Sequence, residues 1–353
     1  MKNELIRILF YAINGVGLGH VARLSVISKY ITDTFQNSKI NFYSNSPFAS
    51  DFFGCQGDTL FIPNEVELSE RKKLILSSFN EAAERYQPHI VVCDTYWPVP
   101  AINLLKKQGV RTVLIVRLIS VSRACETLKS ALEDFDLIII PHLIEEIHAL
   151  YGNDSQLVEL IRHPKILISG PVARISSKVS KKNVSQVLFS LGGGGEYDRP
   201  KSSNTIESMK NIMYKTCEEL IRKGIKCFFA RGPFLPDLKQ LENWNILETL
   251  SLQEFINEST VMVSRAGYNT CWETLGAGGR LLLIGDHVGF EDVEKRGNFL
   301  EELGLAINTQ NKLDDLADIV YREITQGWDS KLIQLKASVN IGLDNIVKQI
   351  MNF

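Results

Sequence analysis

Short apolar runs alternate with longer amphipathic stretches along the first half of this chain of 353 residues. The helix-like stretches include residues 22–35 and 69–85, which show apolar positions at helical spacing. Strand-like apolar runs lie at residues 5–13, 40–43, 59–62, 89–93, 112–116, 137–140 and 165–169. This alternation predicts a parallel sheet with helices on both faces.

The same alternation starts again after a segment rich in Ser and Lys at residues 175–183, which is the best linker candidate. A helix-like stretch spans 205–223, and a final amphipathic stretch spans 330–353. Further strand-like runs lie at residues 186–191, 226–230, 245–247, 261–263, 281–284 and 305–307. We therefore predict two Rossmann-like domains, over residues 1–172 and 184–330, facing across a cleft. Ligands of such sheets bind at the carboxyl ends of the strands.

Residues 264–273, with the sequence SRAGYNTCWE, stand between two of these predicted strands. A helix beginning near Gly267 would direct its first N–H groups and its positive dipole end at an anion. Thr270 and Glu273 would share one helix face, so that a phosphate at the first turn leaves a ribose diol against the carboxylate. The alternative is an ordinary loop in which the glycine caps the helix and Glu273 faces solvent.

A first glycine turn, NGVGLGH at residues 14–20, follows the first predicted strand. Its spacing is G-x-G-x-G, and the next strand ends without an acidic residue, so the turn does not match a dinucleotide-binding fingerprint. We expect its glycines to admit a ligand closely. His20 would then lie at a helix N-terminus as a general base in its neutral form. The alternative is a histidine that caps its own helix.

A second glycine turn comprises Gly192, Gly193, Gly194 and Gly195, and it predicts an anion-binding concavity. The alternative is a flexible surface loop. A P-loop is excluded, because no Lys-Ser or Lys-Thr pair follows the glycines at the required spacing.

Several carboxylates also fall near predicted strand ends. Asp94 follows a strand, where it can serve the active site or cap a turn. Glu291 and Asp292 can hold sugar hydroxyls or merely begin a charged helix. The sequence Asp134-Phe135-Asp136 resembles a metal-binding D-x-D, but it precedes its strand and would lie at the wrong edge of the sheet. We therefore expect no metal site there.

Composition narrows the function classes. A net charge of −2 gives no global basic field for nucleic acid. No apolar run approaches the length of a membrane-spanning helix, and the first residues lack a signal-peptide pattern. The six cysteines are scattered without a CxxC pair, which is typical of buried thiols in a reducing compartment. These features predict a cytoplasmic location.

Two of these motifs resemble one known family, the GT-B glycosyltransferases related to MurG (the family 28 type), and in particular a group of predicted bacterial glycosyltransferases. The first motif is G-L-G-H-x-x-R at residues 17–23, and the second is G-Y-N-T-x-x-E at residues 267–273. The likeness extends over most of the chain. It implies a GT-B fold whose final helix, about 331–353, crosses back to the N-terminal domain.

The resemblance also implies roles for individual residues. A nucleotide-sugar donor would bind the C-terminal domain, with Glu273 on the ribose and Arg265 beside the diphosphate. The turn residues Gly267, Tyr268, Asn269 and Thr270 would join Arg265. The acceptor would lie over the N-terminal domain beside Gly17, Gly19, His20 and Arg23. Neither a cofactor nor an obligatory metal is expected, because helix dipoles and N–H groups would stabilise the departing diphosphate.

Two departures from the MurG pattern leave the sugar and the base of the donor open. Asp292 and Val293 occupy the positions of a glutamine pair that contacts the sugar, and no aromatic residue matches the one that covers uracil. The leading prediction is an inverting hexosyltransferase that uses a UDP-sugar. The alternatives are a nucleotide-sugar hydrolase of the same fold and a non-catalytic binding protein. The acceptor remains open among small molecules, glycans and lipid carriers, and peripheral membrane contact remains open with it.

Overall fold

The computed structural model divides into two compact units. The N-terminal unit comprises Met1–Val172 together with Ile341–Phe353, and the C-terminal unit comprises Ala173–Asn340. The described residues are 5–13, 18–55, 57–62, 66–117, 121–152, 154–174, 183–192, 202–233, 245–250, 252–284, 293–309, 312–325 and 342–352.

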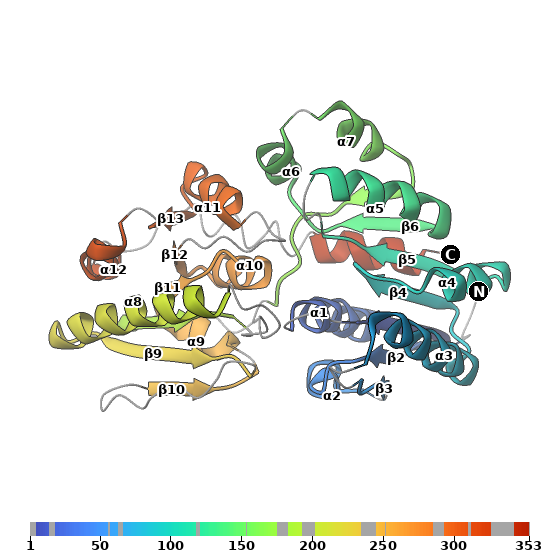
Figure 1. The fold of residues 1–353 in the computed structure, drawn as a ribbon, viewed down its shortest axis with the longest axis horizontal. Coiled ribbons are helices and arrows are strands. Elements are labelled where there is room, and N and C mark those ends of the chain that lie inside the picture. The colour runs from blue at the N-terminus through green and yellow to red at the C-terminus, as the bar shows by residue number, and fades with distance from the viewer. Residues whose placement is uncertain are drawn as a thin grey trace. The chain divides into compact units, whose positions relative to one another are not determined.

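The N-terminal unit is built on a seven-stranded parallel sheet (Figure 1). The strand order is β3-β2-β1-β4-β5-β6-β7, so the direction of strand addition reverses between β1 and β4. The strands are β1 (Ile6–Ala12), β2 (Ser38–Ser44), β3 (Gly57–Thr59), β4 (Ile90–Asp94), β5 (Arg111–Ile115), β6 (Leu137–Ile140) and β7 (Ile166–Ile168).

Helices cover both faces of this sheet, as the alternation predicts. In β1, Leu9 and Tyr11 pack into one core, and Ile8 and Phe10 pack into the other, because successive side chains of a strand point to opposite faces. The helices on the Leu9 face are α3 (Leu68–Tyr86), α4 (Val99–Lys107), α5 (Val121–Asp134), α6 (Ile144–Tyr151) and α7 (Ser155–Leu160). The Ile8 face carries α1 (Gly19–Thr34), α2 (Ala49–Phe53) and the helix over residues 342–351.

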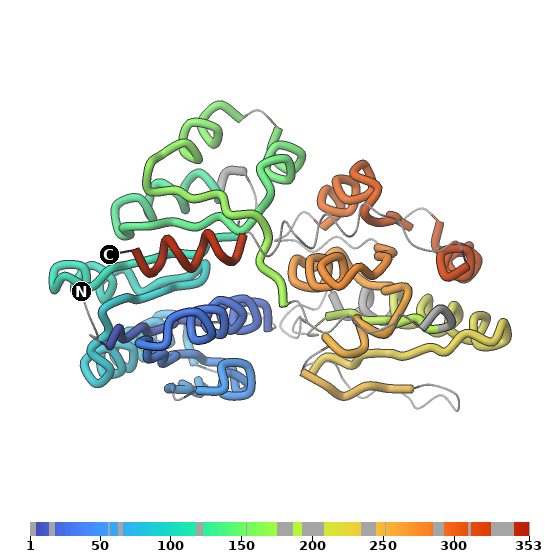
Figure 2. Tube along the Cα trace, turned by 180° about the vertical axis from the view of Figure 1, so that it is seen from behind, coloured from blue at the N-terminus to red at the C-terminus, as the bar shows by residue number. Residues whose placement is uncertain are grey.

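The helix over residues 342–351 joins the N-terminal unit although the whole C-terminal unit precedes it in the chain. Figure 2 shows it in red beside the sheet. Its buried face consists of Leu343, Ile346, Val347 and Ile350, at helical spacing. Arg111 at the start of β5 donates to the backbone carbonyls of Gln349 (2.8 Å) and Asn352 at the far end of the helix. The helix is therefore held by apolar packing and by a side chain at its C-terminus.

The C-terminal unit repeats the architecture with a six-stranded parallel sheet in the order β10-β9-β8-β11-β12-β13. Here the reversal lies between β8 and β11. The strands are β8 (Asn183–Ser190), β9 (Lys226–Arg231), β10 (Asn245–Glu248), β11 (Ser259–Ser264), β12 (Arg280–Leu283) and β13 (Ala306–Asn308).

The helices of the C-terminal unit are α8 (Ser202–Arg222), α9 (Gln253–Glu258), α10 (Tyr268–Gly276), α11 (Val293–Glu302) and α12 (Leu316–Thr325), with a 3₁₀ turn at Leu313–Asp315. Both α8 and α12 pack on one face of the sheet around Val187, Phe229 and Val263. The predicted strands and the predicted helices over 22–35, 69–85 and 205–223 occur, with their ends moved by a few residues; β3, for example, is Gly57–Thr59 where residues 59–62 are predicted. Of the predicted final helix, residues 330–341 lie outside the described residues. None of the described helices is both long and apolar enough to span a membrane.

Candidate functional site

His20 and Asp94 meet at the strand reversal of the N-terminal sheet. His20 lies in the first turn of α1, which follows β1, and Asp94 is the last residue of the neighbouring strand β4. His20 Nδ1 lies 2.7 Å from Asp94 Oδ1. The N-cap of α1 is Leu18, and the partner of the His20 ring is Asp94 on the neighbouring strand. The crevice outside such a reversal is where ligands bind in open α/β sheets.

Arg23 holds the same carboxylate from the next turn of α1. Its Nε donates to Asp94 Oδ2 at 2.8 Å, and its second terminal nitrogen donates to Oδ1 at 2.6 Å. The side chains of Arg23 and Asp94 are 1% and 0% exposed, whereas that of His20 is 12% exposed. The expected place of Arg23 beside the acceptor stays a prediction. Its guanidinium is buried against Asp94, which in turn contacts His20.

The charge of Asp94 is well stabilised in this cluster. Burial by itself would raise the pKa of Asp94, but the Arg23 guanidinium and then His20 outweigh it, and the pKa lies well below its usual range. Asp94 therefore stays a carboxylate, and a carboxylate can only accept the hydrogen bond that joins it to His20 Nδ1. With Nδ1 as the donor to Asp94, a neutral imidazole carries its lone pair on Nε2, where a proton can be taken up.

Thr95 marks a strained turn directly after β4. Its φ is +63°, a left-handed conformation that is rare for a β-branched residue. Its hydroxyl donates to Asp94 Oδ1 at 2.9 Å, and its N–H donates to the Ile115 carbonyl. The turn presents Tyr96, half exposed, with its ring centroid 5.9 Å from that of His20. Strain of this kind, about 1–3 kcal/mol, persists where surrounding contacts enforce it, and it gathers at functional sites.

The turn before α10 lies at the strand reversal of the C-terminal sheet. It connects the end of β11 to α10, whose N-cap is Gly267. A glycine cap has no side chain to satisfy the first N–H groups of the helix, which leaves that end suited to an anion. Gly192, directly beyond β8 on the neighbouring strand, has a φ of +78° and donates its N–H to Ser190 Oγ. Gly192, the described residue of the second glycine turn, thus follows the strand next to the one that leads into α10.

The helix α10 has one buried face and one accessible face. Cys271, Trp272 and Leu275 are buried, whereas Asn269, Thr270 and Glu273 are partly exposed. Thr270 and Glu273 therefore share the accessible face, as the spacing predicts. Arg265 is partly exposed as well. The side chain of Tyr268 is only 1% exposed, so it is the Tyr268 backbone that a ligand at the helix end could contact.

Arg296 on α11 supports this turn from below. It is 2% exposed, donates to the Ala266 carbonyl at 2.8 Å, and lies over the Tyr268 ring at 5.9 Å from the centroid. A buried guanidinium at this place fixes the turn and adds positive charge near the N-terminus of α10. This supporting role of Arg296 is not predicted from the sequence. The available signal is that it shares a helix face with the apolar Val293 and Leu300.

Glu273 is held by Arg174, the second residue of the C-terminal unit. Arg174, within the C-terminal unit, donates its backbone N–H to the Glu273 carboxylate and also brings its charge near. The partial burial of its side chain nevertheless raises the pKa of Glu273 to about 7. A carboxyl group whose pKa lies near neutral pH, on a helix at the strand reversal of a sheet, is typical of a functional position.

Other predicted site residues lie outside the described part of the chain, namely Gly17, Gly193, Gly194, Glu291 and Asp292. Gly19 begins α1 next to His20. The two aspartates of the D-x-D sequence have structural partners. Asp134 accepts from the Trp97 indole at 2.7 Å, and Asp136 accepts from the Thr112 N–H at 2.9 Å, at the start of β5. Among the described residues, no three His, Cys, Asp or Glu side chains gather as a metal site requires.

Comparisons with known proteins bear on the fold. No family model and no curated protein matches the sequence. Among solved structures, the chain is similar to the glycotransferase of kitacinnamycin, with a TM-score of 0.64, 14% identity and 99% of each chain covered. It is also similar to Medicago truncatula UGT71G1 complexed with UDP-glucose, with a TM-score of 0.64, 12% identity and 99% of each chain covered.

A third similar structure is a putative UDP-N-acetylglucosamine 2-epimerase from Listeria monocytogenes. Its TM-score is 0.61 at 11% identity, with 99% of this chain and 98% of that chain covered. At such low identity these likenesses establish the fold. The protein has the GT-B fold of two parallel-sheet α/β domains, which confirms the predicted fold class. The narrower resemblance to MurG stays a prediction.

Proposed function

We propose that this protein is a glycosyltransferase that moves a sugar from a nucleotide-diphosphate donor to an acceptor hydroxyl or amine. The observation that carries the proposal is the His20–Asp94 pair, held by a strained turn at the strand reversal of a GT-B N-terminal domain. Fold alone does not define a function, but a buried carboxylate that orients a partly exposed imidazole is the arrangement of a general base.

In the proposed reaction, Nε2 of His20 takes the proton of the acceptor nucleophile. The nucleophile forms a bond to the anomeric carbon as the bond from that carbon to the diphosphate oxygen breaks. The nucleoside diphosphate departs with the bonding electrons. A single displacement of this kind inverts the configuration at the anomeric carbon. Asp94 fixes the tautomer and stabilises the imidazolium that forms.

The donor would bind the C-terminal unit at the turn before α10. The diphosphate would lie at the N-terminus of α10 near Arg265, and Glu273 would accept hydrogen bonds from the ribose hydroxyls. The C-terminal strand reversal, the buried Arg296 and the accessible Thr270–Glu273 face support this placement. That the similar Medicago structure holds UDP-glucose favours a UDP-sugar.

Two substitutions separate the proposed roles. Glu273→Ala should weaken UDP binding by roughly 10- to 100-fold, because a hydrogen bond to a charged group contributes about 1.5–3 kcal/mol. His20→Ala should leave UDP affinity nearly intact but lower turnover by about 10²–10⁴. Calorimetry with UDP and release of UDP from UDP-sugars in an acceptor screen measure the two effects. Glu254→Ala, an exposed position on α9, is the matched control.

The same assay distinguishes the alternatives. Release of UDP at full rate without an acceptor would identify a hydrolase. Conversion of UDP-N-acetylglucosamine to an isomer without UDP release would identify an epimerase, which the likeness to the Listeria structure makes worth testing. Binding of UDP-sugars without turnover in any acceptor screen would identify a binding protein. Unchanged UDP affinity in Glu273→Ala would overturn the placement of the donor.

A further inference from the structure

Arg23 and His20 share one carboxylate. Asp94 Oδ1 receives His20 Nδ1, one Arg23 terminal nitrogen and the Thr95 hydroxyl within 2.9 Å, and Oδ2 receives Arg23 Nε. This is a side-on, two-point pairing in which the plane of the guanidinium fixes the plane of the carboxylate. The orientation of Asp94, and through it that of the His20 ring, is therefore set by Arg23.

Before His20 is protonated, the positive charge of Arg23 balances the negative charge of Asp94. A buried carboxylate alone beside an imidazole strongly favours the protonated ring. Here the buried Arg23 cation already neutralises Asp94, so a proton on His20 creates a net positive charge. Among the described residues, Cys93 lies next to Asp94 on β4, and the Tyr96 ring lies near that of His20. Burial raises the pKa of the Cys93 thiol well above its ordinary value, so Cys93 adds no charge to the cluster near neutral pH.

We propose that Arg23 is a positioning residue that orients Asp94 and balances its charge, so that His20 works as a weak base. The inference rests on the proposed function, since the proton affinity of His20 matters only where an acceptor is deprotonated. It assigns to Arg23 a role beyond holding the fold. A purely structural ion pair would affect stability without changing how readily the ring takes up a proton.

The test is a cycle of charge-removing variants, read by NMR titration of the His20 ring in the full chain without nucleotide. Arg23→Gln leaves Asp94 unbalanced and should raise the midpoint of the ring titration by about one pH unit or more. Asp94→Asn leaves Arg23 unbalanced and should lower it by a similar amount. The double variant Arg23→Gln/Asp94→Asn removes both charges, so its midpoint should return close to that of the wild type.

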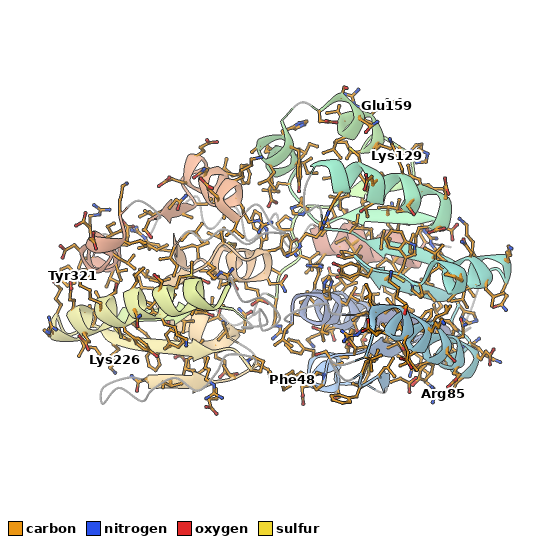
Figure 3. All side chains as sticks on the ribbon, viewed as in Figure 1. Phe48, Arg85, Lys129, Glu159, Lys226 and Tyr321 are labelled. Atoms are coloured by element: carbon orange, nitrogen blue, oxygen red, sulfur yellow. The ribbon has the colours of Figure 1, made fainter. Side chains whose placement is uncertain are left out.

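The double variant also protects the test against misfolding, because it leaves no uncompensated buried charge. If neither single variant folds, a midpoint of the His20 titration in the double variant that is close to the wild-type midpoint still supports the charge balance between Arg23 and Asp94. A midpoint well below the wild type would overturn it, as would an Arg23→Gln variant that folds and titrates unchanged. Arg85→Gln is the matched control. Arg85 projects from the outer side of α3, 59% exposed and paired with Asp58 (Figure 3), and its loss should not move the midpoint.

Failure of this inference can be told apart from failure of the proposed function. Sugar transfer with an unmoved titration in Arg23→Gln would overturn the role of Arg23 alone. The expected titration shifts without sugar transfer in any acceptor screen would leave the charge balance standing and overturn the base role of His20.

Discussion

The charged form of Glu273 is unfavourable in the folded protein, because its carboxylate is partly withdrawn from water. Burial raises its pKa to about 7, from an unfolded value of 4.5. The native state therefore binds the proton more tightly than the unfolded state does between these two values. Stability falls as the pH rises through this window, and above pH 7 the full cost of the buried charge is present. A group that destabilises the free protein in this way is expected to be retained for a ligand.

Glu273→Gln should therefore stabilise the nucleotide-free protein, but only where the wild-type carboxyl is ionised. We expect almost no gain at pH 4.5 and a gain of up to about 3 kcal/mol at pH 8, measured by urea unfolding. The same variant should bind UDP more weakly, because an amide accepts fewer hydrogen bonds than a carboxylate.

Glu254→Gln, exposed on α9, gives the reference for an unburied position. A gain in Glu273→Gln that is equal at both pH values would show that ionisation is not its cause.

Individual residues also show how far sequence reasoning reaches. His20, Asp94 and the Thr270–Glu273 face follow from strand ends and helix spacing, which are local properties. Arg23 and Arg296 occupy apolar helix faces, and their partners lie far away in the chain. The positive φ of Thr95 has no signal in the sequence, because threonine does not favour that conformation and tertiary contacts impose it.

At the level of elements, the contact between Arg111 and the helix over residues 342–351 joins a strand start to a helix end. Arg111→Ala leaves the last carbonyls of this helix to water and removes the bonds to Gln349 and Asn352. The cost should be about 1 kcal/mol at this exposed position. Hydrogen exchange in residues 342–351 should become faster, while that of α1 stays unchanged.

Arg7→Ala is the matched control for this prediction. Arg7 also donates to an exposed carbonyl, that of Gln87, from a strand of the same sheet. If both variants accelerated exchange in residues 342–351 equally, the effect would not be a property of the Arg111 contact.

The alternation of apolar runs and amphipathic stretches predicts the elements but not their neighbours. The strand orders with β1 beside β4 and β8 beside β11 depend on right-handed crossovers and on packing across the sheet. Only this order brings His20 to Asp94 and Gly192 to the turn before α10. The residues of each candidate site can therefore be predicted from the sequence, but only the strand order shows which of them lie next to one another.

For the whole molecule, we expect the N-terminal unit to depend on the helix over residues 342–351. Its four buried aliphatic side chains each contribute about 1.5–3 kcal/mol, and their sum is comparable to the total stability of a domain. Deletion of residues 341–353 should abolish exchange protection in β1 and β4, whereas β8 and β11 keep theirs. Lys348→Ala, on the exposed face of this helix, is the control and should change neither. Native protection of β1 after the deletion would contradict the prediction.

Gly342 shows how tightly this helix is seated. A Cβ at this position would lie 2.7 Å from the Ser169 carbonyl oxygen, so the returning chain passes directly over the segment by which it left the unit. During synthesis on the ribosome, the surface that this helix covers stays uncovered until the C-terminal unit has been made, because that unit lies between the two segments in the chain. During that interval, one apolar face of the N-terminal sheet lacks its cover, a condition that recruits chaperones. A chain whose synthesis stops before residue 341 is therefore a target for quality control and not a working half of the protein.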